Sequence, residues 1–250
     1  MLIRGFYFGD HSIRRWDQDY YGTAIQWLAE FCLYPLAQSA DTVLHATDPE
    51  FDFQPSQLPS HHHYVGFLLW EASNELPEFV KEPDDPWALV TLSTAPQREE
   101  LTLAHSALQA LADQPVRTLL TVPGRGYPEA LDDIPENVTL TGFVPHTPVL
   151  DRSSIVISHA GHGLVSKALF HRVPMVLLPW DRDQPGLAER AERLGVARVV
   201  PRPDVSLRSV RQAVSSVMNE TDYHETARRV SERLKKVDAV NTAGRLVENR

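Results

Sequence analysis

From Trp87 onward, short apolar runs alternate with longer segments of helical periodicity. The apolar runs have the length of strands and cover residues 87–93, 116–122, 138–143, 153–158, 174–180 and 197–200. The segments of helical periodicity cover residues 98–114, 163–172, 184–195, 206–218 and 225–237. Apolar strands that alternate with helices predict βαβ units. We therefore expect an α/β fold, with a Rossmann-like parallel sheet covered by helices on both faces.

Residues 1–86 have a different texture. Aromatic residues and prolines are scattered there, and residues 23–40 predict a helix interrupted at Pro35. The stretch "ELPEFVKEPDDPW" holds three prolines and five acidic residues, and it has the composition of a linker. We therefore divide the chain into a short irregular N-terminal remnant with an interdomain linker, residues 1–86, and a regular domain, residues 87–250.

Composition narrows the class of protein. The chain has 250 residues, of which 42% are hydrophobic, and a net charge of −9. An acidic balance argues against a nucleic-acid partner, because neutralising phosphates requires a basic surface. Cys32 is the one cysteine, so no disulfide framework is expected and a cytoplasmic location is the simplest interpretation. We expect neither a signal peptide nor an integral membrane segment, because no apolar run approaches the roughly 20 residues of a membrane span.

The stretch "SHAGHGLVSKAL", residues 158–169, joins a predicted strand to a predicted helix. In parallel sheets, ligands bind beyond the carboxyl ends of the strands, where this loop lies. Gly161 and Gly163 allow close approach of a ligand and unusual backbone dihedrals, and the following helix directs its free amides at the loop. A phosphate or diphosphate fits such a loop, with His159 as a hydrogen-bond donor. The alternative is that the glycines only turn the chain and His159 packs locally.

Two further loops carry polar groups. Ser93 and Thr94 follow the first predicted strand and suit an anion, although the same residue types also serve as plain helix caps. In "TGFVPHTPVLDRSS", residues Phe143, Val144 and His146 offer a flat, partly polar surface to a nucleobase.

The loop "DRDQPG" follows the fifth predicted strand. Asp183 and Gln184 suit hydrogen bonds to neighbouring hydroxyls of a sugar, and the alternative is a solvated helix start. Asp181 and Asp183 also form an Asp-x-Asp pair that is able to hold a divalent metal, a hypothesis that the intervening Arg182 disfavours. The run of three histidines at 61–63 is interpreted as surface decoration and not as a metal site.

The stretch "GHGLVS" approximates a dinucleotide-binding fingerprint, with Ser166 in place of the third small residue and Asp181 near the position of a ribose-binding acid. An NAD-dependent Rossmann enzyme is therefore an alternative. That fingerprint belongs to the first βαβ unit of a Rossmann domain, whereas three predicted strands precede it here.

Taken together and in order, these loops resemble a known family. "LVTLST", "GFVPHTPVL", "ISHAGHGLVSKAL" and "VPMVLLPWDRDQPGLAERAERLGVA" are similar to the C-terminal donor-binding domain of the GT-B glycosyltransferases, in the group of UDP-glycosyltransferases and bacterial natural-product glycosyltransferases. The resemblance covers roughly Asp41 to Arg245 and is densest over 138–197.

The resemblance implies a metal-independent transfer, with inversion, of a sugar from a UDP- or dTDP-sugar to an acceptor hydroxyl, without a resident cofactor. The histidine–glycine loop, residues 159–163, and the Ser-Thr pair at 93–94 would face the diphosphate. The "FVPH" segment would line the nucleobase, and the acid–glutamine pair at 183–184 would hold the sugar. The implied binding residues are Ser93, Thr94, Val144, His146, His159, Gly161, His162, Gly163, Asp183 and Gln184.

The sequence departs from the family in two respects. About 40 residues precede the linker-like part, where the family carries a whole acceptor domain, so the catalytic base stays unknown; His11 lies outside the family's context for it. Leu164 stands where the family has Thr or Ser near the phosphate, which predicts weaker donor binding.

The alternative to a glycosyltransferase is a non-catalytic nucleotide-sugar-binding module that needs a partner subunit. The aromatic N-terminal segment predicts partner dependence or self-association.

Overall fold

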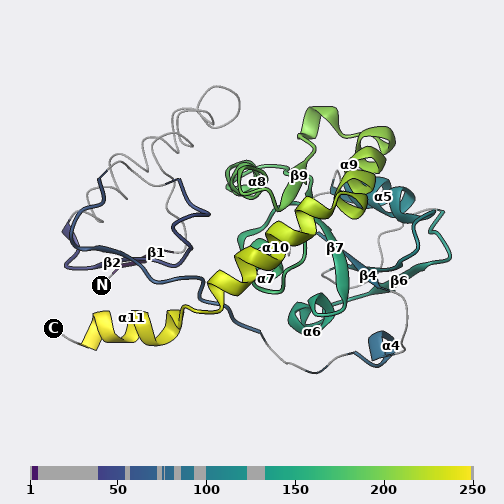
Figure 1. The fold of residues 1–250 in the computed structure, drawn as a ribbon. Coiled ribbons are helices and arrows are strands. Elements are labelled where there is room, and N and C mark those ends of the chain that lie inside the picture. The colour runs from purple at the N-terminus through teal and green to yellow at the C-terminus, as the bar shows by residue number, and fades with distance from the viewer. Residues whose placement is uncertain are drawn as a thin grey trace. The chain divides into compact units, whose positions relative to one another are not determined.

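The computed structural model describes residues 2–4, 39–53, 57–71, 75, 77–81, 86–92, 100–122 and 133–248. The chain forms two compact units (Figure 1). One comprises Met1–Leu68 together with Arg233–Arg250, and the other comprises Leu69–Glu232. The division into a remnant with a linker, 1–86, and a donor-binding domain, 87–250, stays a prediction, because it assigns functions as well as compact units.

The larger unit contains a six-stranded parallel sheet. Its strands are β4 (Trp87–Thr91), β5 (Arg117–Thr121), β6 (Val138–Thr141), β7 (Ser153–Ser158), β8 (Met175–Leu177) and β9 (Ala197–Val199). Their order across the sheet is β6-β5-β4-β7-β8-β9. Each neighbouring pair is parallel. All six strands were predicted from the apolar runs, and the parallel sheet is confirmed.

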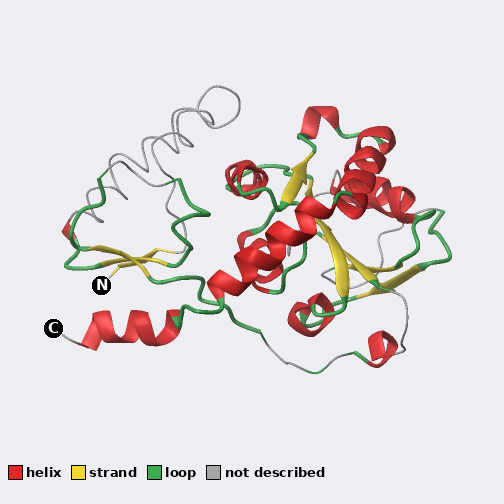
Figure 2. Ribbon diagram, viewed as in Figure 1, coloured by secondary structure: helices red, strands yellow, loops and turns green. Residues whose placement is uncertain are grey.

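The helices of this unit were also largely predicted. They are α4 (Glu78–Lys81), α5 (Glu100–Leu111), α6 (His146–Leu150), α7 (His162–Phe170), α8 (Gln184–Arg193), α9 (Leu207–Asn219) and α10 (Thr221–Leu234), with a 3-10 turn at Arg202–Asp204. Figure 2 shows helices on both sides of the strands, as the sequence predicts. The last two residues of α10 belong to the smaller unit.

Strand periodicity explains why both faces are covered. Because successive side chains of a strand point to opposite faces, alternate residues of β4 and β7 meet different helices. Ala88, Val90 and Ile157 join the buried cluster that includes α5 and α9, which pack against each other. On the other face α6 packs against α7, and α7 packs against α8.

Local signals fix two helix boundaries. Gly195 follows α8 with a φ of +78°, the left-handed conformation that glycine adopts most readily at a helix end. Ser206 precedes α9, and its hydroxyl accepts a hydrogen bond from the Ser209 amide at 3.2 Å in a capping box.

The smaller unit has a three-stranded parallel sheet of β1 (Leu2–Arg4), β2 (Val43–His45) and β3 (His62–Tyr64). Helix α11 (Ala239–Glu248) packs Ala243 and Leu246 against a small buried cluster that includes Leu44. The sequence did not predict these strands or α11. Most of the helix predicted at 23–40 lies outside the described residues.

The histidine run is only partly at the surface. His62 is buried, and its Nδ1 lies 2.9 Å from Nε2 of the buried His45. The interpretation as surface decoration is therefore wrong for His62, because β3 alternates its side chains and turns this one inward. Among the described residues, no three His, Cys, Asp or Glu side chains are grouped so as to hold a metal.

Candidate functional site

The strand order creates a topological switch point between β4 and β7. The chain leaves β4 toward β5 on one side of the sheet, and it leaves β7 toward β8 on the other side. At such a switch point the connecting loops diverge, and ligands of open α/β sheets bind there at the carboxyl edge. Thr91 and Ser158 pair at this edge, and a small pocket reaches them and His159.

The loop from β7 to α7 is tightly folded. The Ser158 hydroxyl accepts a hydrogen bond from the Ala160 amide at 3.2 Å, and Ala160 takes the left-handed conformation at φ +68°. Gly161 is the residue before α7, with an extended backbone at φ −65° and ψ 137°. The expectation of unusual dihedrals at the two glycines is wrong, because the turn is made at Ala160. Gly161 provides no side chain to cap the helix, which leaves the first-turn amides facing the loop.

The His159 ring occupies the space of a side chain at Gly161. A Cβ atom there would lie 2.6 Å from Nε2 of His159, so the imidazole and the Gly161 backbone are in close contact. At Gly163 a Cβ atom would meet nothing within 4 Å. Gly163 is exposed and opens the first turn of α7, so a ligand has room beside it.

The loops after β7 and β8 bring three titratable groups together. Burial raises the pKa of Asp183, while His162 and His159 each act to lower it. Burial also lowers the pKa of His162, an effect that Arg190 adds to and Asp183 opposes. Both shifts favour the uncharged forms of the two side chains. The predicted residues His159, His162 and Asp183 share one electrostatic environment.

Gln184 has a structural task in the same region. It is buried at the first turn of α8, and its Oε1 accepts hydrogen bonds from the amides of Trp180 at 2.8 Å and Asp181 at 3.1 Å. The side chain thereby fixes the loop between β8 and α8. Asp181 pairs with Arg182 at 3.6 Å, an arrangement that does not favour the Asp-x-Asp metal hypothesis.

The segment before α6 lies near the end of β5. Val144 is buried, whereas Phe143 is 73% exposed. Nε2 of His146 lies 3.4 Å from the hydroxyl of Thr121, the last residue of β5. Burial is the main cause that lowers the pKa of His146 to about 4; Lys167 adds to this effect and Glu71 opposes it. His146 is consequently a neutral ring at physiological pH.

Sequence reasoning missed the ion pair beside His146. Nζ of Lys167, on α7, lies 2.8 Å from Oε2 of Glu71, and the same oxygen accepts a hydrogen bond from the Thr147 amide. Glu71 precedes Lys167 by 96 residues, and no local pattern relates them. Ser93 and Thr94, by contrast, were predicted but lie outside the described residues.

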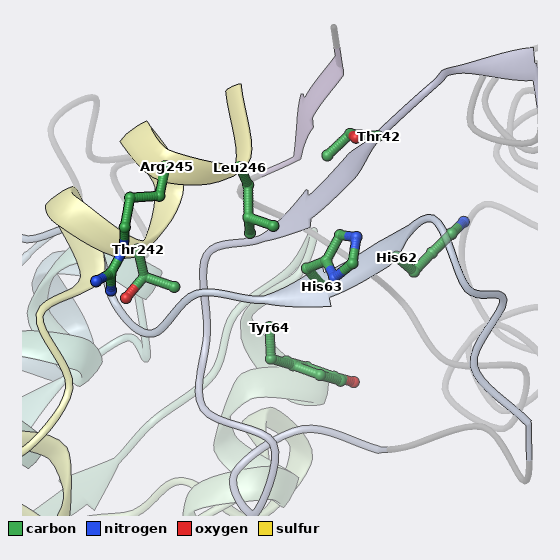
Figure 3. A pocket seen from close by; sticks show the side chains of 7 residues that line it. All are labelled: Thr42, His62, His63, Tyr64, Thr242, Arg245 and Leu246. Carbon is green, nitrogen blue, oxygen red and sulfur yellow. The ribbon is translucent and has the colours of Figure 1, made fainter. Parts of the chain in front are cut away.

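The smaller unit has a pocket of its own, of about 690 Å³. Figure 3 shows that its walls come from β3, α11 and Thr42, the residue before β2, with Arg245 beside Thr242. Two of its polar side chains make structural contacts. The Tyr64 hydroxyl donates to Asp52 at 3.0 Å, and His62 contacts His45. Neither contact indicates a ligand.

Comparison with known proteins places this geometry in a family. Residues 106–247, more than half of the chain, match the family described as Erythromycin biosynthesis protein CIII-like, C-terminal domain. The chain belongs to this family. It thus contains the C-terminal, donor-binding half of a GT-B glycosyltransferase, as the resemblance predicted, and the NAD-dependent alternative is not favoured.

Curated relatives agree with this family. The chain is 25% identical over 202 residues to NDP-glycosyltransferase YjiC of Bacillus subtilis (strain 168). The aligned residues make up 79% of this chain and 50% of that protein. It is 29% identical over 217 residues to 4'-demethylrebeccamycin synthase of Lentzea aerocolonigenes, with 85% and 51% covered. The chain spans about half the length of these relatives.

Solved structures share the fold. The calicheamicin glycosyltransferase CalG4 superposes with a TM-score of 0.72 at 21% identity, covering 99% of this chain and 66% of that one. The glycosyltransferase VinC, solved in complex with dTDP, superposes with a TM-score of 0.69 at 24% identity, covering 82% and 51%. Among the described residues, no helix is both long and apolar enough to cross a membrane.

Proposed function

We propose that this chain binds a nucleoside diphosphate sugar, with UDP or dTDP as the nucleotide, at the carboxyl edge of the six-stranded sheet. It would serve as the donor-binding half of an inverting, metal-independent glycosyltransferase that acts on the hydroxyl of a small-molecule acceptor. The observation that carries the proposal is the position of the histidine–glycine loop, which opens α7 at the switch point between β4 and β7.

The diphosphate would lie against the start of α7. Glycine at 163 leaves room for phosphate oxygens, and the helix N-terminus offers amides and a positive dipole end. His159 is held beside Gly161 at the end of β7 and would donate a hydrogen bond to the same group. As the glycosidic bond breaks, these groups would stabilise the negative charge that develops on the leaving diphosphate.

The neighbouring loops would hold the rest of the donor. Val144 and His146 would line the nucleobase, Asp183 and Gln184 would contact the sugar hydroxyls, and Ser93 and Thr94 would face the phosphates. Because Oε1 of Gln184 already accepts hydrogen bonds from two backbone amides, its Nε2 is the group that would donate to a sugar oxygen. We assign no catalytic base, metal or cofactor to the chain, and we propose a cytoplasmic setting.

A second function is a nucleotide-sugar-binding module without catalysis of its own. The comparisons do not favour it, since the relatives described above are named as a glycosyltransferase and a synthase. An acceptor site and base would then come from a partner subunit, or from self-association through the N-terminal segment. Transfer assays with and without candidate partner subunits separate the two functions.

Calorimetric titration with UDP, dTDP, GDP and NAD, without added metal, tests the donor site. We expect one nucleoside diphosphate to bind to the wild type and to bind at least about tenfold more weakly to His159→Ala, a loss that corresponds to 1.4 kcal/mol. His224→Ala is a matched control, because His224 lies on α10, outside the proposed site. Binding of NAD alone would contradict the proposal, and so would equal affinity in the two histidine variants.

A further inference from the structure

Glu71 connects parts of the larger unit that are distant in sequence. Its Oε2 atom lies 2.8 Å from Nζ of Lys167 on α7 and 3.0 Å from the amide of Thr147 in the first turn of α6. The side chains of Glu71 and Lys167 are 10% and 15% exposed. An ion pair shielded to this degree is screened less by solvent than a surface pair, and removing one partner leaves the other charge poorly compensated.

The contacts join the start of α6, which adjoins the proposed site, to Lys167 in the last turn of α7. Thr147 directly follows His146, and α7 begins with the loop proposed for the diphosphate. A second contact joins the residues that follow the two helices, between Nδ1 of His171 and Oδ1 of Asp151 at 2.6 Å. Two independent contacts therefore set the spacing of α6 and α7, and one of them adjoins the site.

On the basis of the function proposed above, we propose that Glu71 and Lys167 are positioning residues of the nucleotide site. The carboxylate of Glu71 fixes the first turn of α6 to α7, and this contact holds His146 at the carboxyl edge of the sheet, beside Thr121. Neither residue is assigned a contact with the reacting atoms. Their effect on the donor passes through the position of the His146 ring.

The charges of the pair give His146 a measurable signature. Lys167 acts to lower the pKa of His146 and Glu71 acts to raise it, while burial is the larger cause. Glu71→Gln keeps an acceptor for the Thr147 amide but removes the negative charge, so the pKa of His146 should fall further. Lys167→Met removes the positive charge, so the pKa should rise while staying below 6.5. Opposite shifts would show that both charges act on His146, and the loss of nucleotide affinity tests the positioning role.

The experiment compares the full-length wild type with Glu71→Gln, Lys167→Met and the control Asp151→Asn. NMR titration of the His146 ring gives its pKa, calorimetry gives the affinity for UDP and dTDP, and thermal unfolding shows that each variant folds. We expect opposite pKa shifts in the two site variants and about tenfold weaker nucleotide binding in each. Asp151→Asn, which removes the negative charge from the contact after the C-terminal ends of α6 and α7, should change neither quantity.

The possible failures are distinguishable. If the wild type binds neither nucleotide, the proposed function fails, and the positioning role fails with it. If the wild type binds but both site variants bind equally well, only the positioning role is overturned. Shifts of the His146 pKa in the same direction in both variants, or a loss of affinity in Asp151→Asn as large as theirs, also overturn it.

Discussion

At the scale of single residues, positions 161 and 163 of the histidine–glycine loop differ in what a side chain would meet. A side chain at 161 would displace the His159 ring, whereas Gly163 faces open space at the start of α7. Substitutions at the two positions should therefore affect nucleotide affinity and stability differently, which tests directly where the donor lies.

We predict that Gly161→Ala displaces the His159 ring and weakens nucleotide binding about tenfold with little change in stability, because the far end of a side chain moves readily. Gly163→Ala should stabilise the fold by about 0.5–1 kcal/mol, since alanine is favoured over glycine within a helix. It should nevertheless weaken nucleotide binding, because its methyl group would occupy the space proposed for the phosphates. Calorimetry and urea unfolding measure the two effects.

Two outcomes would count against this prediction. In a His159→Ala background, Gly161→Ala should cause little further loss, so additive losses would show that its effect does not pass through the ring. Unchanged affinity in Gly163→Ala would move the diphosphate away from the first turn of α7.

The buried His146 predicts a pH dependence of stability. Its pKa is about 4 in the folded chain and 6.5 in the unfolded chain, so the unfolded state binds more protons between these values. The contribution is fully present above pH 6.5 and is lost as the pH falls toward 4, by about 3 kcal/mol at most. In His146→Gln the free energy of unfolding should fall less steeply between pH 7 and pH 5. Urea unfolding measures this slope, and equal slopes in the two proteins would contradict the assignment.

At the scale of elements, α7 combines a packing face with the proposed anion site. Val165, Ala168 and Leu169 are buried, and Lys167 reaches Glu71. The Ser166 hydroxyl donates to the carbonyl of His162 at 2.6 Å, within the helix. The third position of the apparent dinucleotide fingerprint is thus used for local helix structure.

Leu164 allows the start of α7 to be tested. It is 7% exposed, and its amide donates to the carbonyl of Gly161 at 3.1 Å. Leu164→Thr would place a hydroxyl in the first turn, and we predict about fivefold tighter nucleotide binding from one added hydrogen bond of about 1 kcal/mol. Loss of buried apolar surface should lower stability by about 1–2 kcal/mol. Titration and thermal unfolding give both numbers, and an unchanged affinity would count against this placement of the phosphate.

At the scale of the whole molecule, the chain contains two cores of unequal size. The larger one lies around the six-stranded sheet, and the smaller one joins β2 to α11 through Leu44 and Leu246. A salt bridge joins distant segments of the smaller unit. In the smaller unit Arg233 donates to both carboxylate oxygens of Asp48, at 2.6 and 2.7 Å. Chain ends far apart in sequence therefore form one packed unit.

The sequence by itself determined the repeating elements and the loop chemistry. The six strands of the larger sheet follow from apolar runs, and Gly195 marks the end of α8, because periodicity and helix-end preferences are local properties. The same locality explains the failures. Strand β3 consists of two histidines and a tyrosine, so it lacks the apolar run that marks the strands of the larger sheet. Strands β1 and β2 and helix α11 lie outside the regular alternation of strands and helices that the sequence shows.

Only the tertiary structure decided how the predicted loops meet. Strand order across a sheet depends on long-range packing, and it places the loop of His159 at the switch point and near Asp183. The neutral state of His146 and its neighbours Glu71 and Lys167 depend on burial and on contacts between distant segments. Desolvation and Coulomb interactions act through space, so a linear pattern does not encode them.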